Sequence, residues 1–404
     1  MTPITAATSA AGPADSLTLA CEVSIVMPCL NEADTIGTCI EKAQRAMQAH
    51  AIAGEVVVAD NGSIDASREI ARGLGARVVD VPLRGYGEAL RAGIAAARGT
   101  FVIMGDADDS YDFTEIPRFL EKLRAGADLV QGCRLPSGGG RVLRGAMPLS
   151  HRWIGNPLFS LLARWWFWSP VHDVYCGLRG FRKEYAERLG QRCGGMEFAT
   201  EMIIKASLDR DARIAEVPIT LHPDGRRSHP PHLQTVRDGW RTLRFFLLCT
   251  PRNTFVRPGI TLLALGIVGY ALAMPGVHVA GVTFDAHTLV FASLALLIGY
   301  QAALFGVFAK FSAVRAGLLP RDRRIDRVFD VISLERALLA GVVLMLAGGV
   351  LLAGAVGQWW AADFGNLDYA HTMRWVLPGA TLTALGFQTI LAGLFACVLG
   401  VARQ

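Results

Sequence analysis

The sequence predicts an α/β domain with a Rossmann-like, mostly parallel sheet, followed by an α-helical membrane domain with four spans. Short apolar runs rich in β-branched residues alternate with helical patterns over residues 23–131. Four long apolar segments then fill the C-terminal part of the chain. Hydrophobic residues make up 52% of the 404 residues, which favours a chain partly embedded in lipid. We therefore expect a globular domain at 21–255 and a membrane domain at 256–404.

The first 20 residues are rich in Ala, Thr, Ser and Pro, which predicts a disordered leader. They lack the basic and apolar regions of a signal peptide, so we expect the globular domain to be cytoplasmic. The net charge of +5 favours an anionic membrane surface or phosphate ligands, and no dense basic stripe indicates nucleic acid. None of the eight cysteines forms a C-x-x-C pair, which favours reduced thiols over a zinc or redox site.

The globular domain begins with Val23–Pro28 (VSIVMP), a continuous apolar run typical of a buried parallel strand. Strands and helices then alternate with short links, which indicates a parallel sheet covered on both faces. The expected strands are 23–28, 55–60, 76–81, 101–105 and 127–131, and the expected helices are 33–48, 64–74 and 88–98. Ligands of such sheets bind at the carboxyl ends of the strands, so the loops there matter most.

The membrane part begins with an aromatic segment, Leu158–Trp168, that is too short to cross a bilayer. Its large aromatic residues beside Arg164 favour a helix lying in the membrane interface, and an ordinary core helix is the alternative. Spans are expected near 258–280, 287–312, 334–357 and 375–400.

The link between the second and third spans holds five arginines between positions 315 and 327, which places this link and both termini on the cytoplasmic side. No internal repeat is evident in the four segments. No ionisable residue is evident at the membrane midplane, which argues against an ion-coupled transporter.

Polar motifs follow several of the predicted strands. Pro28–Ala33 (PCLNEA) closes the first strand, and Asp60–Ser63 (DNGS) closes the second. Loops at these places can present polar groups to a base or a ribose, although each also fits a helix cap or a turn without a ligand. Arg84–Leu90 (RGYGEAL) lacks the Walker pattern, and its glycines fit either close approach to a substrate or a plain loop.

Asp106 and Asp108 follow the fourth strand with an alanine between them. In an extended strand end, side chains at i and i+2 point the same way, so one hard divalent cation can draw on both carboxylates. Oxygen ligands favour Mg²⁺ or Mn²⁺ over softer metals. The alternative is a solvated acidic turn, which the position directly after an apolar strand disfavours.

In this order and at these intervals, the four motifs resemble those of family 2 glycosyltransferases with the GT-A fold. The domain order is similar to that of the dolichol-phosphate mannosyltransferase and polyprenyl-phosphate glucosyltransferase branch. The resemblance covers about residues 22–250 and, less specifically, the four spans. It implies inverting transfer of a hexose from a UDP- or GDP-sugar to a polyprenyl or dolichyl phosphate, with Asp106 and Asp108 as metal ligands. The nucleotide pocket that it implies contains Pro28, Leu30, Asn31, Glu32, Asp60, Asn61, Gly85 and Asp106.

The resemblance extends to sites further along the chain. Gly132–Arg134 is similar to a Gly-Ser-Arg whose arginine meets phosphate, and Ser150–Arg152 with Asn156 is similar to the start of the acceptor-side helix. Asp173–Arg182 (DVYCGLRGFR) resembles an Asp-x-x-x-Gly-x-Arg segment. Glu197 and Glu201 resemble a Phe-x-x-Glu helix. The catalytic candidates are Asp106, Asp108, Arg134 and Glu201, and the candidates for the lipid phosphate are Arg134, Ser150, Arg152, Arg226, Arg227 and Ser228.

The chain departs from the family pattern at three places. Ser110 stands where a glutamine is usual, so the third metal ligand is open between Asp109 and water. Asn61 replaces a common aspartate. The basic loop at Arg226–Ser228 is denser than usual and is followed by Pro230-Pro231. These departures leave the donor sugar and base open.

The expected mechanism follows from the charges of the substrates. A lipid phosphate is already an anion at neutral pH, so it needs no general base to attack a sugar. Catalysis should then consist mostly of positioning and charge neutralisation, by the metal and by Arg134, Arg226 and Arg227.

Two other functions are weighed against this one. A processive polysaccharide synthase would carry Q-x-x-R-W, but Asp238 follows Gln234–Arg237, and Thr200-Glu201-Met202 is not the T-E-D of such enzymes. A non-catalytic scaffold or flippase partner would suit the spans alone, but the intact Asp-x-Asp argues against it. The sequence leaves lipid length, pathway and oligomeric state open, including a homo-oligomer.

Overall fold

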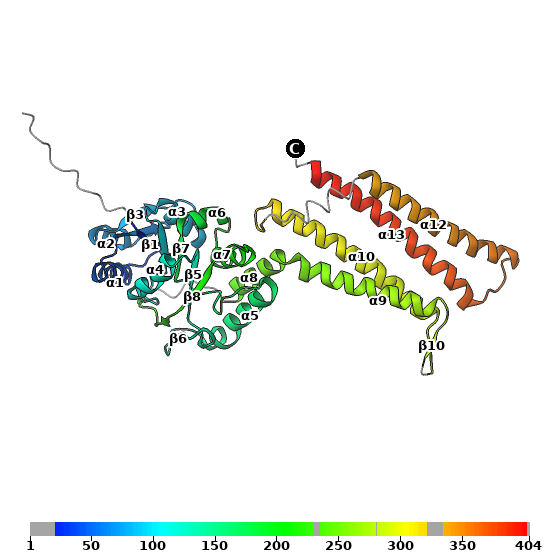
Figure 1. Ribbon diagram of the computed structural model, residues 1–404, viewed down its shortest axis with the longest axis horizontal. Helices are drawn as coiled ribbons and strands as arrows, with labels where there is room; N and C mark the ends of the chain where they lie inside the picture. Colours follow the sequence, from blue (N-terminus) through cyan, green and yellow to red (C-terminus); the bar gives the residue numbers. More distant parts are fainter. Residues whose placement is uncertain (1–20, 229–234, 280, 321–333, 402–404) are drawn as a thin grey trace, which may run out of the picture.

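The computed structural model describes residues 21–228, 235–279, 281–320 and 334–401. The expected leader, Gln234 and the link arginines at 321–327 lie outside these residues. Figure 1 shows an α/β region at one end of the molecule and two long helical hairpins at the other. This arrangement confirms the predicted fold class.

The α/β region is built on a seven-stranded sheet with the order β3-β2-β1-β4-β7-β5-β8. Strands β1 to β4 are parallel where they pair, as predicted, whereas β7 is antiparallel to both of its neighbours. The strands of this sheet are β1 (Val23–Cys29), β2 (Gly54–Asp60), β3 (Arg77–Asp80), β4 (Phe101–Met104), β5 (Leu129–Cys133), β7 (Arg179–Arg182) and β8 (Ile214–Pro218). The short strands β6 (Arg141–Val142) and β9 (Thr220–Leu221) form a separate pair.

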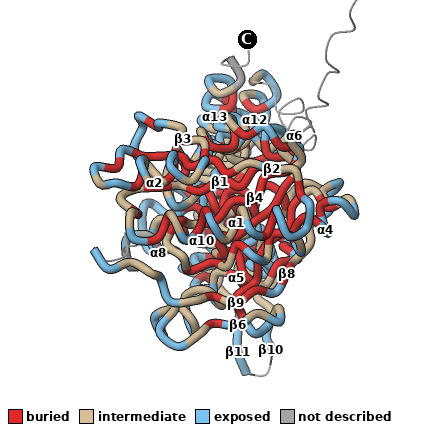
Figure 2. Tube along the Cα trace, turned by 90° about the vertical axis from the view of Figure 1, so that its left-hand side faces the viewer, coloured by how far each residue is buried: buried red, intermediate tan, exposed pale blue. Residues whose placement is uncertain are grey.

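Helices cover both faces of the sheet, because alternate residues of the buried strands point to opposite sides. Ile25 and Met27 of β1 face one hydrophobic cluster, and Val26 faces the other. The strands accordingly form the buried centre of the domain (Figure 2). The helices are α1 (Ile36–Ala49), α2 (Ser67–Gly73), α3 (Tyr86–Ala96), α4 (Ile116–Arg124), α5 (Asn156–Phe167), α6 (Lys183–Leu189), α7 (Glu197–Leu208) and α8 (Thr235–Cys249). Short 3-10 turns η1 (Phe113–Glu115) and η2 (Pro136–Gly138) and π-helical turns η3 (His151–Gly155) and η4 (Arg252–Val256) complete the region.

The membrane part consists of four helices that are long and apolar enough to cross a bilayer, which confirms the predicted spans. The first is Arg252–Ala273, which joins η4 to α9 (Arg257–Ala273). The others are α10 (Ala286–Arg315), α12 (Leu334–Ala361) and α13 (Tyr369–Val401), and the strands β10 (His278–Val279) and β11 (Val282–Thr283) join the first two. The end of α10 returns to the globular domain, where Ala313 packs in the same hydrophobic cluster as α7 and α8.

The two hairpins share a glycine spacing, which corrects the expectation that the spans contain no repeat. Gly259 and Gly266 of α9 are matched 82 residues later by Gly341 and Gly348 of α12. The sequence from Gly299 to Ala309 (GYQAALFGVFA) is matched 87 residues later by that from Gly386 to Ala396 (GFQTILAGLFA). The matched residues Phe308 and Phe395 stack edge to face between α10 and α13, with ring centroids 5.0 Å apart. Equivalent residues that meet in this way indicate two hairpins related by a pseudo-two-fold axis.

The glycines explain how the helices of each hairpin approach closely. A Cβ at Gly299 would lie 2.8 Å from the carbonyl oxygen of Gly259, and a Cβ at Gly348 would lie 2.6 Å from that of Gly379. A larger residue at either place would force the two helices apart. Gly349, in contrast, has nothing within 4 Å of an added Cβ.

We expect Gly348→Ala to lower the thermal unfolding midpoint in detergent, because the new methyl group overpacks the α12–α13 contact by about 1–3 kcal/mol. The adjacent Gly349→Ala is the matched control, since it adds the same methyl group in open space. Equal midpoints for the two variants would show that close packing at Gly348 does not hold the hairpin together.

Candidate active site

The polar motifs meet at the carboxyl edge of the sheet, as predicted. Asp60 ends β2 and is buried, and its carboxylate accepts backbone hydrogen bonds from Gly62 at 3.1 Å and Ser63 at 3.2 Å. Asn31 follows β1 with a positive φ of 59°, and its side-chain oxygen accepts a hydrogen bond from the backbone of Ile64 at 2.9 Å. The loops after β1 and β2 are therefore joined to each other beside Asp60.

Asn61 holds the loop that precedes α3. Its amide donates to the carbonyl oxygens of Leu83 at 2.7 Å and Val81 at 3.3 Å, and its oxygen accepts from the backbone of Gly85 at 2.7 Å. A carboxylate cannot donate to those carbonyl groups, which explains why asparagine stands where the family often has aspartate. The structure thus gives Asn61 a structural role, and its contact with a nucleotide stays a prediction.

The glycines of the 84–90 loop are likewise required by the protein itself. Gly85 has a φ of 148°, and a Cβ there would collide with the carbonyl oxygen of Gly194. That oxygen accepts hydrogen bonds from the backbone of Gly87 at 2.9 Å and Glu88 at 3.2 Å. The close approach that the glycines allow is therefore to the segment around Gly194.

Asp106 and Asp108 are held by neighbouring hydroxyl groups. Tyr86 donates to Asp106 Oδ1 at 2.9 Å, and Ser110 donates to Asp108 Oδ1 through its hydroxyl at 2.6 Å and its backbone at 3.0 Å. Burial, followed by the charge of Asp108, raises the pKa of Asp106 to about 6. Gly177 packs so closely that a Cβ on it would lie 2.7 Å from Asp106 Oδ2.

Ser110 and Asp109 of the acidic loop each have a defined partner here. Ser110 supports Asp108, and so replaces the usual glutamine with a group that orients a carboxylate. Asp109 has a positive φ of 62° and forms an ion pair with Lys42 at 2.7 Å. Its carboxylate is thereby engaged with Lys42, and the choice between Asp109 and water as a third metal ligand stays a prediction.

The donor set suits a hard divalent cation that takes its remaining ligands from water and a substrate. Within the described ranges, no group of three or more His, Cys, Asp or Glu side chains is placed to hold a metal ion. Mg²⁺ commonly binds through one or two carboxylates together with substrate phosphates, and Asp106 with Asp108 provides such a pair.

A basic loop lies over these carboxylates. We call residues 222–228 the arginine strap. Arg226 forms a two-pronged ion pair with Glu32, with distances of 2.7–3.0 Å, and its third nitrogen lies 3.2 Å from Asp108 Oδ2. The backbone groups of Arg227 and Ser228 donate to Asp34 Oδ2 at 2.9 and 2.8 Å. The structure therefore brings three of the residues expected at the lipid phosphate to the carboxylate edge.

Arg134 has a different environment from the one expected. Its guanidinium is buried and pairs with Asp173 at 2.7 and 2.9 Å, and it also donates to the hydroxyl of Tyr111 at 3.3 Å. The same hydroxyl accepts a hydrogen bond from the backbone of Gly177 at 2.8 Å. Arg134 thus supports the Asp173–Gly177 segment, and its contact with a phosphate stays a prediction.

Glu201 also has a structural role, which argues against a catalytic one. It is fully buried, pairs with Lys205 at 2.7 Å, and accepts backbone hydrogen bonds from Arg192 and Cys193 at 2.8–3.0 Å. These bonds fix the segment that carries Gly194 against the start of α3. Glu197 begins α7 and is partly buried.

Sequence reasoning assigned no role to three groups that build the site. Tyr86 and Tyr111 carry no pattern that marks them. Arg179 is fully buried and donates to the carbonyl oxygens of Cys176 at 2.9 Å, Val174 at 2.8 Å and Ala199. Its place in the Asp-x-x-x-Gly-x-Arg segment was the available signal, although the pattern alone does not show that it binds carbonyl groups.

The predicted interfacial segment has two faces. Phe167 is buried in the domain core, whereas Ile154, Leu158, Leu161 and Trp165 are between 48% and 66% exposed. Their spacing of three and four residues places them on one side of η3 and α5. Arg152, a candidate for the lipid phosphate, lies at the start of this surface and stacks on Trp153 at 5.4 Å. Ser150 precedes η3 and is exposed.

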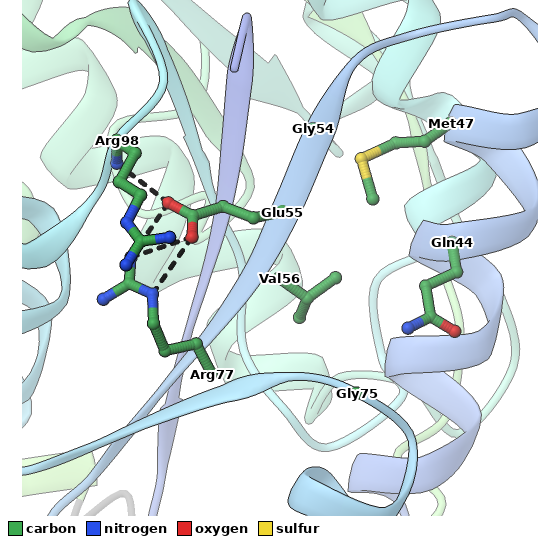
Figure 3. A pocket seen from close by; sticks show the side chains of 8 residues that line it. All are labelled: Gln44, Met47, Gly54, Glu55, Val56, Gly75, Arg77 and Arg98. Carbon is green, nitrogen blue, oxygen red and sulfur yellow. Dashed lines mark hydrogen bonds and ion pairs between the residues drawn. The ribbon is translucent and has the colours of Figure 1, made fainter. Parts of the chain in front are cut away.

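A cavity of about 310 Å³ lies at the opposite edge of the sheet, where β2 and β3 begin (Figure 3). Glu55 forms an ion pair there with Arg77 at 2.9 Å and accepts a hydrogen bond from the backbone of Arg98 at 2.8 Å. Because this edge lies away from the carboxyl ends of the parallel strands, we assign it no part in the candidate active site.

A mostly parallel sheet with an Asp-x-Asp pair at its carboxyl edge, joined to membrane spans, defines a membrane-bound glycosyltransferase of the GT-A type. The chain belongs to glycosyltransferase family 2. Residues 24–190 match the family's catalytic region, "Glycosyl transferase family 2", and residues 307–400 match its "C-terminal transmembrane region".

Several curated proteins are similar to the chain. The low-salt glycan biosynthesis hexosyltransferase Agl6 of Haloferax volcanii is 39% identical, and the match covers 86% of this chain and 82% of Agl6. A dolichyl-phosphate hexose transferase of the same organism is 34% identical, over 49% of this chain and 82% of its own length. A dodecaprenyl-phosphate galacturonate synthase of Rhizobium johnstonii is 29% identical, over 50% of this chain and 59% of its own length.

Among solved structures, glucosyl-3-phosphoglycerate synthase from Mycobacterium tuberculosis, in complex with Mn²⁺ and UDP, is 25% identical. The match covers 56% of this chain and 78% of that one, with a TM-score of 0.42.

We expect Asp173→Asn to destabilise the protein by about 3–5 kcal/mol, because it leaves the buried Arg134 charge without its partner. Chemical denaturation in detergent measures the effect. Glu22→Gln is the matched control, since it breaks a two-pronged pair with Arg124 of the same 2.7 Å geometry at the surface. An exposed pair contributes about 0–1 kcal/mol, so similar losses for the two variants would contradict the structural role given to Arg134.

Proposed function

We propose that the protein transfers a hexose from a nucleoside diphosphate sugar to a polyprenyl phosphate, with inversion, at the cytoplasmic face of a membrane. The observation that carries the proposal is the contact of the arginine strap with the acidic pair, in which a guanidinium nitrogen of Arg226 lies 3.2 Å from Asp108 Oδ2. The strap supplies positive charge for a phosphate at the place where the carboxylates suit a cation. The named activities of the dolichyl-phosphate and dodecaprenyl-phosphate relatives support the same class of acceptor.

The donor would bind at the ends of β1, β2 and β4. Asp60 and the loop of Asn31 would face the nucleoside, and Asp106 with Asp108 would hold Mg²⁺ or Mn²⁺. The metal would neutralise the diphosphate and help it to leave the sugar. Tyr86 and Ser110 keep the two carboxylates in place, which reduces the reorganisation that the reaction requires.

The acceptor needs no general base, because a phosphate monoester is ionised at neutral pH. Glu201, one of the catalytic candidates, is fully buried in its pair with Lys205 and so takes no part in this scheme. Positive charge from the strap would orient the lipid phosphate. Catalysis would then depend mainly on position and electrostatics.

The exposed apolar side of η3 and α5 would lie in the membrane interface. It combines large apolar residues with arginines, which is the composition of interfacial helices. Arg252, at the start of the first span, stacks on Trp168 at 4.4 Å and so ties this surface to the membrane helices. An acceptor whose chain is in the bilayer could then reach the carboxylate edge with its phosphate.

We expect purified protein in detergent to label a polyprenyl phosphate when supplied with one of a panel of UDP- and GDP-sugars and Mg²⁺ or Mn²⁺. Lipid extraction measures the product, and chelation of the metal should abolish it. Labelled polymer formed without added lipid would instead support a processive synthase, and binding without turnover would support a non-catalytic role.

Asp108→Asn should lower the rate roughly 10²–10³-fold, as for the loss of one preorganised electrostatic group. Near wild-type activity of that variant with unchanged metal dependence would exclude Asp108 as a ligand.

We expect an environment-sensitive fluorophore on Leu161→Cys to report an apolar setting in lipid nanodiscs, because Leu161 is 62% exposed on the proposed interfacial side. Spin-labelled lipids should quench it. Arg118→Cys on α4 is a matched control, since Arg118 has a side chain 48% exposed and lies outside this surface. Equal emission and quenching at both positions would show that the α5 side does not contact the bilayer.

A further inference from the structure

The arginine strap is fixed to the carboxylate edge by its backbone. His222 donates to the carbonyl oxygen of Ser110 at 2.9 Å, and Gly225 donates to that of Asp108 at 2.9 Å. Gly225 also packs tightly, because a Cβ on it would lie 2.9 Å from the side chain of Thr35. Together with the two hydrogen bonds to Asp34, these contacts direct Arg226 inward.

The guanidinium of Arg226 stands among three carboxylates. It pairs with Glu32 through two nitrogens and with Asp108 through the third, and Asp224 lies 3.6 Å away. The side chain is only 11% exposed. These neighbouring carboxylates, Glu32 first among them, raise the pKa of Arg226 against the opposing effect of its burial.

This pairing uses the part of Asp108 that a metal would need. Asp108 Oδ1 already accepts two hydrogen bonds from Ser110, and Oδ2 faces Arg226. A divalent cation on Asp108 would therefore meet a positive side chain at close range. Glu32 can retain Arg226 through the three hydrogen bonds from two of its nitrogens while the third nitrogen is released, because the two pairings use different atoms of the guanidinium.

We propose that Arg226 is a place-holding cation, which neutralises Asp108 in the donor-free enzyme and competes with the metal until a diphosphate arrives. This inference rests on the proposed function, since it takes Asp106 and Asp108 to bind a divalent cation. The diphosphate offsets the repulsion between metal and arginine, and the released nitrogen then faces phosphate. Arg226 is in this sense a positioning residue that links metal occupancy to the phosphate site, and it favours binding of the donor before the acceptor.

The test is a Mn²⁺ titration of the full-length protein in detergent, followed by electron paramagnetic resonance of the free ion, without nucleotide. Arg226→Ala should bind Mn²⁺ roughly tenfold more tightly than the wild type, because a competing charge near the metal has been removed. Arg227→Ala is the matched control. It removes the same charge from an exposed residue of the same strap, and it should change the affinity by less than about twofold because exposed charges are screened.

The same titration is repeated in the presence of UDP and, separately, of GDP. In the presence of the nucleotide that binds, Arg226→Ala should no longer bind Mn²⁺ more tightly than the wild type. It should bind the metal–nucleotide complex more weakly than the wild type. A purely structural role of Arg226 predicts no such reversal. Arg226→Lys keeps the charge but cannot bridge Glu32 and Asp108 with separate nitrogens of a planar fork, and it should show a smaller gain for free Mn²⁺. It serves as the test if the alanine variant does not fold.

Three outcomes of these titrations would overturn the place-holding role of Arg226. Unchanged or weaker binding of free Mn²⁺ by both Arg226 variants would overturn the place-holding role and leave the proposed function standing, because the metal still binds. An equal gain for Arg227→Ala would also overturn it, since general charge would then explain the effect. Failure of every form to bind Mn²⁺, with or without nucleotide, would overturn both this inference and the proposed metal dependence.

Discussion

Repulsion among carboxylates at one edge of the sheet is the constraint on which the rest of the site depends. Glu32, Asp60, Asp106 and Asp108 follow three adjacent strands, and none is strongly exposed. Each must be balanced in the absence of substrate, since an uncompensated buried charge is costly. Backbone groups donate hydrogen bonds to Asp60, and hydroxyl groups donate to Asp106 and Asp108. Arg226 forms ion pairs with Glu32 and Asp108. The protein therefore keeps at this edge the negative charge that a bound cation would need. Its own groups balance that charge only in part.

The raised pKa of Asp106 shows where that compensation is incomplete. One neutral hydrogen bond from Tyr86 does not offset burial and the nearby charge of Asp108. A buried carboxylate whose charge is incompletely balanced is typical of functional positions. At a purely structural position, replacing it would increase the stability of the protein. A divalent metal ion would supply the missing positive charge in the proposed reaction.

The sheet, the spans and the Asp-x-Asp pair were predictable, because they depend on the order of neighbouring residues along the chain. A buried strand is a continuous apolar run, and its end is the next polar residue. The roles of Asn61, Arg134 and Glu201 were not predictable, because a polar residue type does not reveal which partner satisfies it. Arg134 meets Asp173 only after the strands are assembled. The repeat of the membrane hairpins lies in the sequence itself, but the reason for its glycines becomes clear only when the helices that they bring together are known.

The position of α5 relative to the carboxylates is set by a continuous series of buried contacts. Ser160 on α5 accepts a hydrogen bond from the backbone of Val174 at 3.3 Å, next to Asp173. Asp173 holds Arg134, Arg134 reaches Tyr111, and Tyr111 fixes Gly177 against Asp106. In the proposed reaction, the lipid phosphate would have to stay at a fixed height above the metal site. Buried charged pairs are costly to form but rigid once made, and this one connects the exposed side of α5 to the reacting edge. Arg134 lies at the centre of this series and so supports the carboxylate edge from within the domain.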